Sequence, residues 1–328
     1  MTAKKNATTV AVKDFAPNQY PRGCRYDLDL DLGLQAEAGS LPLILLRGAE
    51  RGETLVVTAG IHGDEYEGVR AILEVCHELD PLRMKGDLLA VTAANPAALW
   101  ERSRTSPIDG GNLARLFPGS LEGSPSEVIA FHLGRSVIAH ADLYLDLHSA
   151  GVKLLMPSMV GYDANDERSR SAALDFGAPV IWGHPVVEAG RTISFAAECG
   201  IPWLYTEARG AGRIAPDDLR MFKRGMRNLL LRLGILDGSI DVIPPQHRLY
   251  GNGDTDSSLI ANERGFFIPD VNLLDHVVTG EPLGRTLSLH GETLEEFYAP
   301  HAGVVGLVRV CPVVHPGDPV FLIADIHP

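Results

Sequence analysis

The chain has 328 residues, 45% of them hydrophobic and 22% charged, which is typical of a globular protein with one large domain and a smaller one. A formal net charge of −13 argues against nucleic acid or an anionic membrane as the main partner. No apolar run approaches the roughly 18 residues of a membrane span, and the first residues, MTAKKNATTV, lack the apolar core of a signal peptide. We therefore expect a cytoplasmic protein.

Up to residue 244 the sequence predicts strands that alternate with helices. Apolar residues follow β-type patterns, which predict strands over 24–34, 41–48, 54–60, 86–96, 142–151, 178–183 and 201–210. Helical spacing predicts helices over 67–79, 126–141, 167–177 and 216–236. Ser126 is the expected N-cap of the second helix, and Pro216 suits the first turn of the fourth. This alternation predicts an α/β fold whose mixed sheet is flanked by helices on both faces.

The pattern changes after residue 244. Residues 245–328 carry short apolar runs broken by Gly, Pro and Asp, and they contain no convincing helix. We expect a larger α/β domain over residues 1–244, which would carry the chemistry, and a smaller C-terminal all-β domain over residues 245–328.

One short stretch, TAGIHGDEYEG, carries residues that a fold alone does not require. His62 and Glu65 follow a predicted strand directly, at the edge of the sheet where α/β folds place ligands. His148 ends another predicted strand in LDLHSA, and two histidines with one glutamate form a typical catalytic zinc set. Asp64 and Asp146 are candidates to hold an imidazole tautomer. Taken alone, His-x-x-Glu is a weak signal, because a polar turn at a helix start explains it equally well.

A third strand end and a long loop add polar groups to this set. Glu207, in LYTEARG, is a candidate base that would take a proton from water and pass it to a leaving amine. The loop RSRTSPIDGGNLARLFPG carries Arg102, Arg104 and Arg115, and guanidinium groups suit carboxylate binding or stabilisation of an oxyanion. Without a functional role, Glu207 would be a salt-bridged acid at a strand end, and the segment with the arginines would be a solvated loop.

Five motifs in this order resemble the succinylglutamate desuccinylase/aspartoacylase family, whose members are related to zinc carboxypeptidases. The motifs are GIHGDEYEG, Asn95-Pro96, PIDGGNLARLFPG, DLHSAG and YTEARG, and the resemblance covers residues 40–245. The C-terminal stretch beginning APHAGVVG is similar to the β domain of bacterial members. The resemblance implies a zinc-carboxypeptidase-like mixed sheet flanked by helices, followed by a small β domain.

The resemblance also implies roles for the site residues. His62, Glu65 and His148 would hold one Zn²⁺ per chain, and Glu207 would act as general base and then as general acid. These assignments agree with what the residue types and their positions at strand ends suggest.

Two arginines would contact the substrate by the same resemblance. Arg115 would bind a substrate carboxylate, and Arg104 would polarise the scissile carbonyl. Members of the family have an Asn-Arg pair at this point, whereas Ala114 precedes Arg115 here. Asn112 is the candidate replacement in substrate binding, although in an extended segment it would point differently. Because Ala114 replaces this asparagine, the sequence leaves open how the substrate carboxylate is bound.

The activity implied is zinc-dependent hydrolysis of the amide bond of a small N-acyl amino acid or related N-acyl amine. A carboxypeptidase-like peptidase and a non-catalytic metal-bearing binding protein remain as alternatives. The expected partner is a small-molecule N-acyl substrate, with no nucleic acid and no membrane, and a homo-oligomer is left open. The C-terminal pattern is also similar to biotinyl and lipoyl carrier folds, but residues 245–328 contain no lysine to which such a cofactor could be attached.

Overall fold

The structure, a computed structural model, describes residues 7–34 and 39–326. The α-helices in this part of the chain are α1 (Glu67–Glu78), α2 (Pro96–Glu101), α3 (Pro125–His132), α4 (Glu167–Phe176), α5 (Thr192–Glu198) and α6 (Pro216–Arg232). The strands up to residue 208 are β1 (Thr8–Ala11), β2 (Cys24–Asp31), β3 (Ser40–Arg47), β4 (Glu50–Ala59), β5 (Lys85–Val91), β6 (Leu143–Ser149), β7 (Leu154–Leu155), β8 (Met159–Asp163), β9 (Val180–His184) and β10 (Trp203–Ala208). The later strands are β11 (His247–Tyr250), β12 (Leu259–Ile260), β13 (Gly265–Pro269), β14 (His276–Val277), β15 (Pro282–Leu287), β16 (Thr293–Tyr298), β17 (Gly303–Arg309), β18 (Val313–Val314) and β19 (Pro319–Ile326).

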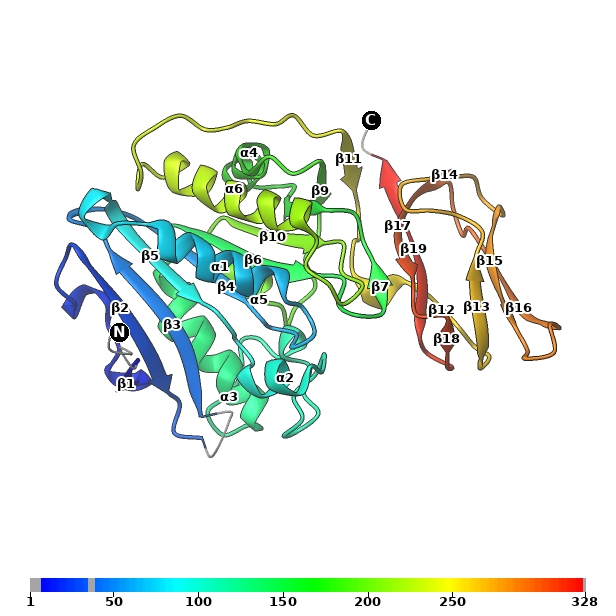
Figure 1. Ribbon diagram of the computed structural model, residues 1–328, viewed down its shortest axis with the longest axis horizontal. Helices are drawn as coiled ribbons and strands as arrows, with labels where there is room; N and C mark the ends of the chain where they lie inside the picture. The colour runs from blue at the N-terminus through cyan, green and yellow to red at the C-terminus, as the bar shows by residue number, and fades with distance from the viewer. Residues whose placement is uncertain (1–6, 35–38, 327–328) are drawn as a thin grey trace.

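A large mixed sheet organises the molecule, and helices cover both of its faces (Figure 1). Its strands lie in the order β1-β2-β3-β5-β4-β6-β10-β8-β9-β11-β19-β17-β14. Alternate residues of each strand enter different cores. In β4, Leu55 and Val57 pack with α1, α4 and α6, whereas Val56 packs with α3 and α5. The predicted α/β class, with a mixed sheet flanked by helices, is confirmed.

Three neighbouring strands in the middle of the sheet position the site. β4, β6 and β10 run parallel, so their carboxyl ends meet at one edge. The register places Ala59 beside Leu147 and His148 beside Glu207. This edge is where parallel strands of an α/β sheet present ligand-binding residues.

The C-terminal part of the chain is built from strands, as predicted. β16, β15, β13 and β18 form a second, antiparallel sheet. The helical structure among the described residues beyond 244 is limited to one 3₁₀ turn, at Thr255–Ser257. Apolar residues of the C-terminal part of the chain form a separate core between 261 and 323. The large sheet nevertheless continues into this region, because β11 pairs with β9 on one side and with β19 on the other. The boundary between residues 244 and 245 therefore stays a prediction.

The predicted N-cap of the helix over 126–141 is wrong. The helix α3 starts after Ser124, whose hydroxyl accepts the Glu127 N–H while the Glu127 carboxylate accepts the Ser124 N–H. Pro125 occupies the first helical position, which favours this start. Ser126 lies inside the helix, and its hydroxyl donates to Asp109 at 2.8 Å.

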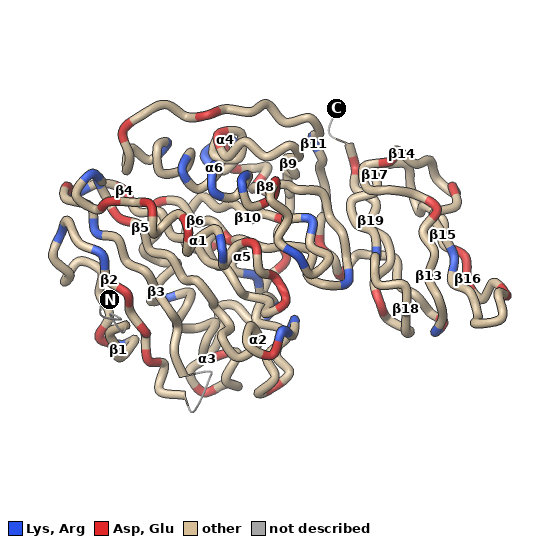
Figure 2. Tube along the Cα trace, in the orientation of Figure 1, with Lys and Arg blue, Asp and Glu red and all other residues tan. Residues whose placement is uncertain are grey.

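Charged residues are distributed over both parts of the molecule in Figure 2. Within residues 7–34 and 39–326, no helix has the length and apolar character needed to cross a membrane.

Candidate active site

A glycine allows the loop after β4 to approach α2 closely. The Gly63 N–H donates to the Ser103 carbonyl at 3.0 Å, and a Cβ at position 63 would lie 2.0 Å from the carbonyl carbon of Ala98. Only glycine fits there without displacing backbone. The loop therefore packs against α2 and holds His62 and Glu65 at the end of β6.

His62, Glu65 and His148 form a compact cluster. Each offers one ligand atom, and these atoms lie within 4.8 Å of one another. The Glu65 Oε2 accepts the Ser149 N–H at 3.0 Å and lies 3.0 Å from the His148 Nδ1. The structure thus brings together the three residues predicted as metal ligands.

Each imidazole has a second partner that fixes its orientation. The His148 Nε2 lies 3.0 Å from the Asp146 carboxylate, so Nδ1 is the nitrogen left for a metal. The His62 Nδ1 donates to the Arg104 carbonyl at 3.1 Å. Asp64 is the other candidate partner of an imidazole, and its carboxylate instead accepts the Val152 N–H at 3.4 Å.

Asp146 is the centre of a buried polar network. It is fully buried, and it accepts hydrogen bonds from the hydroxyls of Thr58 and Thr192. Burial opposes its ionisation, but the charge of His148 and these hydrogen bonds outweigh burial and lower its pKa. The network keeps a carboxylate beside His148. Burial lowers the pKa of His148, but the Asp146 and Glu65 carboxylates outweigh burial and raise it well above its usual value.

The two glutamates of the site differ in ionisation. Burial opposes the charge on Glu65, but the charges of His62, His148 and Arg104 outweigh it and lower its pKa to about 2. Burial, and next the charge of Glu65, raise the pKa of Glu207 to about 8. The Oε2 of Glu207 is also buried without a hydrogen-bond partner.

These residues fit a zinc ion. Two imidazoles and one carboxylate are the donor set of catalytic zinc sites, and here His62 and Glu65 are buried while His148 is partly exposed to the pocket. The unpartnered oxygen of Glu207 beside this cluster is the kind of buried polar atom that a ligand or an ion normally satisfies.

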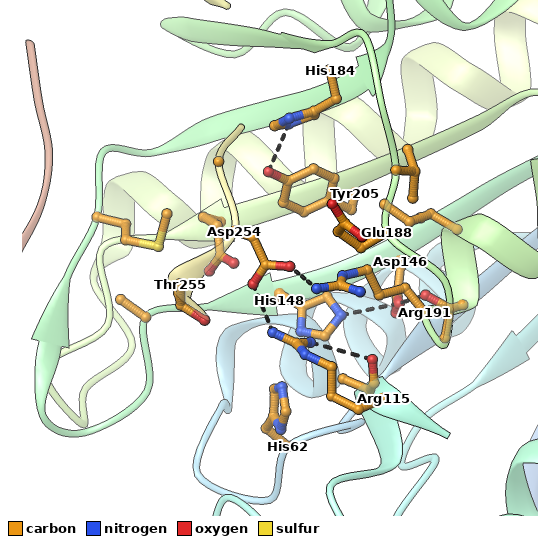
Figure 3. A pocket seen from close by; sticks show the side chains of 18 of the residues that line it. His62, Arg115, Asp146, His148, His184, Glu188, Arg191, Tyr205, Asp254 and Thr255 are labelled. Atoms are coloured by element: carbon orange, nitrogen blue, oxygen red, sulfur yellow. Dashed lines mark hydrogen bonds and ion pairs between the residues drawn. The ribbon is translucent and has the colours of Figure 1, made fainter. Parts of the chain in front are cut away.

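A pocket opens over the cluster (Figure 3). Its empty volume is about 870 Å³, which includes open solvent at the mouth. Six parts of the chain contribute to it, within residues 62–65, 104–115, 146–156, 184–193, 205–207 and 252–255.

The three residues predicted to act on the substrate have different partners and positions in the structure. Arg104 lines the pocket and pairs with the Glu65 Oε1 at 3.1 Å. Arg115 also lines it, but its guanidinium pairs with Asp254 at 2.8 Å and with Asp256 at 2.9 Å. Asn112 is not among the described lining residues. Its amide oxygen accepts the Ala114 N–H at 3.2 Å, as the N-cap of a 3₁₀ turn.

Among the lining residues that escaped the sequence prediction are His184, Arg191, Tyr205 and Asp254. Tyr205 stands two residues before Glu207 on the same strand, so period-two alternation could have placed it on the same face. His184 ends a predicted strand, as His148 does. Arg191, which pairs with Asp254, and Asp254 itself lie on connecting segments with no spacing signal.

Comparisons with known proteins agree with this site. The sequence profile of the succinylglutamate desuccinylase/aspartoacylase catalytic domain matches residues 51–233. An N-alpha-acetyl-L-2,4-diaminobutyric acid deacetylase from Halomonas elongata is 32% identical over 295 residues, which cover 87% of this chain and 86% of that protein. The chain belongs to the succinylglutamate desuccinylase/aspartoacylase family. It is therefore a hydrolase of the deacylase class.

Solved structures show the same fold. A succinylglutamate desuccinylase from Silicibacter sp. TM1040 superposes with a TM-score of 0.83 and 28% identity, covering 93% of this chain and 95% of that one. The product-bound ectoine utilization protein EutE (DoeB) from Ruegeria pomeroyi gives a TM-score of 0.83 and 29% identity, covering 93% and 96%. Both matches extend beyond the catalytic domain into the C-terminal β region.

Proposed function

We propose that this protein hydrolyses the amide bond of a small N-acyl amino acid in a zinc-dependent reaction. The observation that supports this most directly is the cluster of His62, Glu65 and His148 beside the unpartnered Oε2 of Glu207. The relative from Halomonas elongata is named for removing an acetyl group from an amino acid, which favours the same class of substrate.

His62, Glu65 and His148 would hold the zinc ion. When bound, zinc supplies a Lewis acid that acidifies water and polarises an amide carbonyl. Glu207 takes a proton from the attacking water at its Oε2 and later gives it to the leaving amine. Its buried surroundings suit this exchange, because they weaken the preference of the carboxyl group for the ionised form.

The two arginines of the pocket loop have separate roles in this proposal. Arg104 is 39% exposed, and Glu65 is its one ion-pair partner among the described residues, so Arg104 can stabilise negative charge on the carbonyl oxygen once Glu65 serves as a ligand. Arg115 stays our candidate for the substrate carboxylate. The aspartates occupy its Nε and Nη2, whereas its Nη1 donates to the Ala114 carbonyl at 3.3 Å and makes no other hydrogen bond within the described part of the chain. Asn112, turned to cap its own 3₁₀ turn, has no support for a substrate role.

The test is release of carboxylic acid from a panel of N-acetyl and N-succinyl amino acids, with and without a chelator. We expect chelator-sensitive turnover. Glu207→Gln should keep its zinc and lose at least about 100-fold in turnover, because acid–base catalysis is worth about 10²–10⁴-fold. Glu198→Gln, at an exposed helix end, is the matched control and should behave as wild type.

Other outcomes separate the alternatives. Cleavage of peptides but not of acyl amino acids would establish the peptidase. Bound zinc with no turnover of either class would establish the binding protein. Full activity of Glu207→Gln would refute the role of Glu207.

A further inference from the structure

An aspartate from the C-terminal part of the chain is bound to the arginine that is our candidate for the substrate carboxylate. Asp254 follows β11, and its Oδ1 accepts a hydrogen bond from the Arg115 Nη2 at 2.8 Å. Its other oxygen pairs with the Arg191 Nη2. In Figure 3 the Asp254 carboxylate lies between the two guanidinium groups, with a dashed line to each. Only 10% of the Asp254 side chain is exposed, so solvent screens these pairs weakly.

The other arginine of the pocket has a carboxylate partner as well. Among the described residues that line the pocket, three are arginines: Arg104, Arg115 and Arg191. Arg104 pairs with Glu65, whereas the other two share Asp254. A ligand carboxylate therefore meets guanidinium groups whose charge is already partly neutralised.

The donors of Arg115 show how strongly it is occupied. A guanidinium group binds a carboxylate best through two parallel N–H bonds. Its Nε donates to Asp256 at 2.9 Å, and its Nη2 donates to Asp254. Its Nη1 donates to the Ala114 carbonyl at 3.3 Å. A ligand carboxylate must share Arg115 with two aspartates, so it gains less than it would from an unpaired guanidinium group.

The segment that carries Asp254 is held in place by packing and by its own hydrogen bonds. The Asn252 Oδ1 accepts the Asp254 N–H at 2.9 Å, and the Asp254 Oδ1 accepts the Asp256 N–H at 3.0 Å. A Cβ at Gly253 would lie 2.7 Å from the His184 ring, so glycine lets the segment pass close to β9. The contact of Asp254 with the two arginines is thus built into the fold.

Amide hydrolysis leaves carboxylates in the pocket. Water adds to the acyl carbon, the C–N bond breaks, and the products at neutral pH are a carboxylate and an amine that has become an ammonium group. An amino acid product also keeps the carboxylate by which the substrate was bound. Arginines without carboxylate partners would retain such products, because each pairing with a guanidinium group is charge-assisted.

We propose that Asp254 is an internal competitor for Arg115, which lowers the affinity of the pocket for carboxylates and so limits inhibition by the products. Asp254 is not needed merely to hold Arg115 in place, because Arg115 keeps two further anchors, Asp256 and the Ala114 carbonyl. This inference rests on the proposed deacylase function, in which Arg115 binds the substrate carboxylate.

The variant Asp254→Asn tests the competitor, because it removes the charge and keeps an amide oxygen as acceptor for the arginines. kcat/KM is measured for the most active member of the N-acetyl and N-succinyl amino acid panel, as the free acid and as its α-carboxamide. We expect the ratio of acid to carboxamide to rise about 10-fold in the variant, as for one hydrogen bond to a charged group. The inhibition constant of the free amino acid product should fall by a similar factor.

Two further variants locate the effect. Asp256→Asn should raise the same ratio by less, because 66% of the Asp256 side chain is exposed and solvent screens its charge. Asp270→Asn is the control, because Asp270 pairs with Arg285 in the C-terminal sheet, and its ratio should equal that of wild type. An unchanged or lower ratio in Asp254→Asn would overturn the competitor, and a lower one would mean that Asp254 positions Arg115 for the substrate.

Binding without turnover separates this inference from the deacylase function. Calorimetry compares succinate with its neutral analogue succinamide for wild type and for Asp254→Asn. We expect the variant to bind succinate about 10-fold more tightly and succinamide as wild type does. No hydrolysis of any panel member would overturn the deacylase and leave this comparison intact. Equal or weaker binding of succinate by Asp254→Asn would overturn the competitor, whatever the turnover.

Discussion

Glu65 and Glu207 stand in one pocket and titrate far apart, with pKa values lowered to about 2 and raised to about 8. Two histidines and an arginine surround the first, whereas the second is buried with an oxygen that has no partner. Such a separation is how active sites divide the roles of two acids. Glu65 remains a permanent anion suited to holding a cation, and Glu207 is suited to exchanging protons.

His184 gives a prediction on pH and stability. Its pKa is about 4 in the folded protein because of burial, against about 6.5 when unfolded. As pH falls below about 6.5, the unfolded chain binds a proton that the folded protein refuses, so stability falls until about pH 4 and no further from this group. The loss amounts to about 3 kcal/mol.

Denaturant unfolding of wild type and His184→Gln, with a chelator present at every pH, measures this contribution. Wild type should be the more stable at pH 7.5, and its advantage should shrink towards pH 4. His290→Gln, at an exposed turn, should follow wild type throughout. An advantage that is constant with pH would show that His184 does not titrate this way.

At the residue scale, the sequence could predict groups that stand at strand ends and carry recognisable chemistry. His62, Glu65 and His148 meet as their positions in the motifs suggest. Asn112 could not be judged in this way, because the direction of its side chain depends on a 3₁₀ turn that the spacing does not reveal.

Among the elements, the loop between β4 and α1 is the most constrained by packing. Gly63→Ala would force a Cβ to within 2.0 Å of the α2 backbone, so the loop must move and carry His62 with it. We expect zinc affinity to fall by about 10- to 100-fold, as when the support of a metal ligand is lost. Competition with a chelator measures this affinity.

The control is Gly280→Ala. Gly280 has a φ of +80° and open space around its Cβ position, so its substitution strains the backbone without a collision. Zinc affinity should remain at the wild-type value. Wild-type affinity in Gly63→Ala as well would mean that the loop accommodates the methyl group without moving His62.

Prediction of elements succeeded where apolar periodicity is long and failed where local capping decides. The helix α6 begins at Pro216, as its amphipathic pattern indicates. The start of α3 depends on a reciprocal pair of hydrogen bonds between Ser124 and Glu127, and Ser126 is a serine in a similar context. Periodicity cannot choose between two serines that both precede the apolar run.

For the whole molecule, the continuous sheet predicts a single unfolding transition. β11 joins β9 to β19, and one apolar cluster combines Met159 and Trp182 with Leu249, Leu307 and Leu322. Separating the two parts would expose the fully buried Trp182. Calorimetry and tryptophan fluorescence should therefore report coincident midpoints. Two separated transitions would instead support independent domains divided between residues 244 and 245.

The ion pairs of Asp254 with Arg115 and Arg191 show what sequence patterns cannot predict at this scale. Asp254 belongs to a segment beyond residue 244 and meets Arg115 and Arg191 only because β11 extends the sheet past β9. No periodicity links positions so far apart in the chain. A strand pairing that only the folded chain reveals places them together.

The location of these groups also bears on how related enzymes diverge. His148 and Glu207 lie on β6 and β10, two neighbouring strands in the middle of the sheet. Glu188 and Asp254 lie on connecting segments, which tolerate replacement far more readily. A lineage could thus acquire a new substrate without rebuilding its reaction. A laboratory library confined to residues 186–191 and 252–256 would explore the same route.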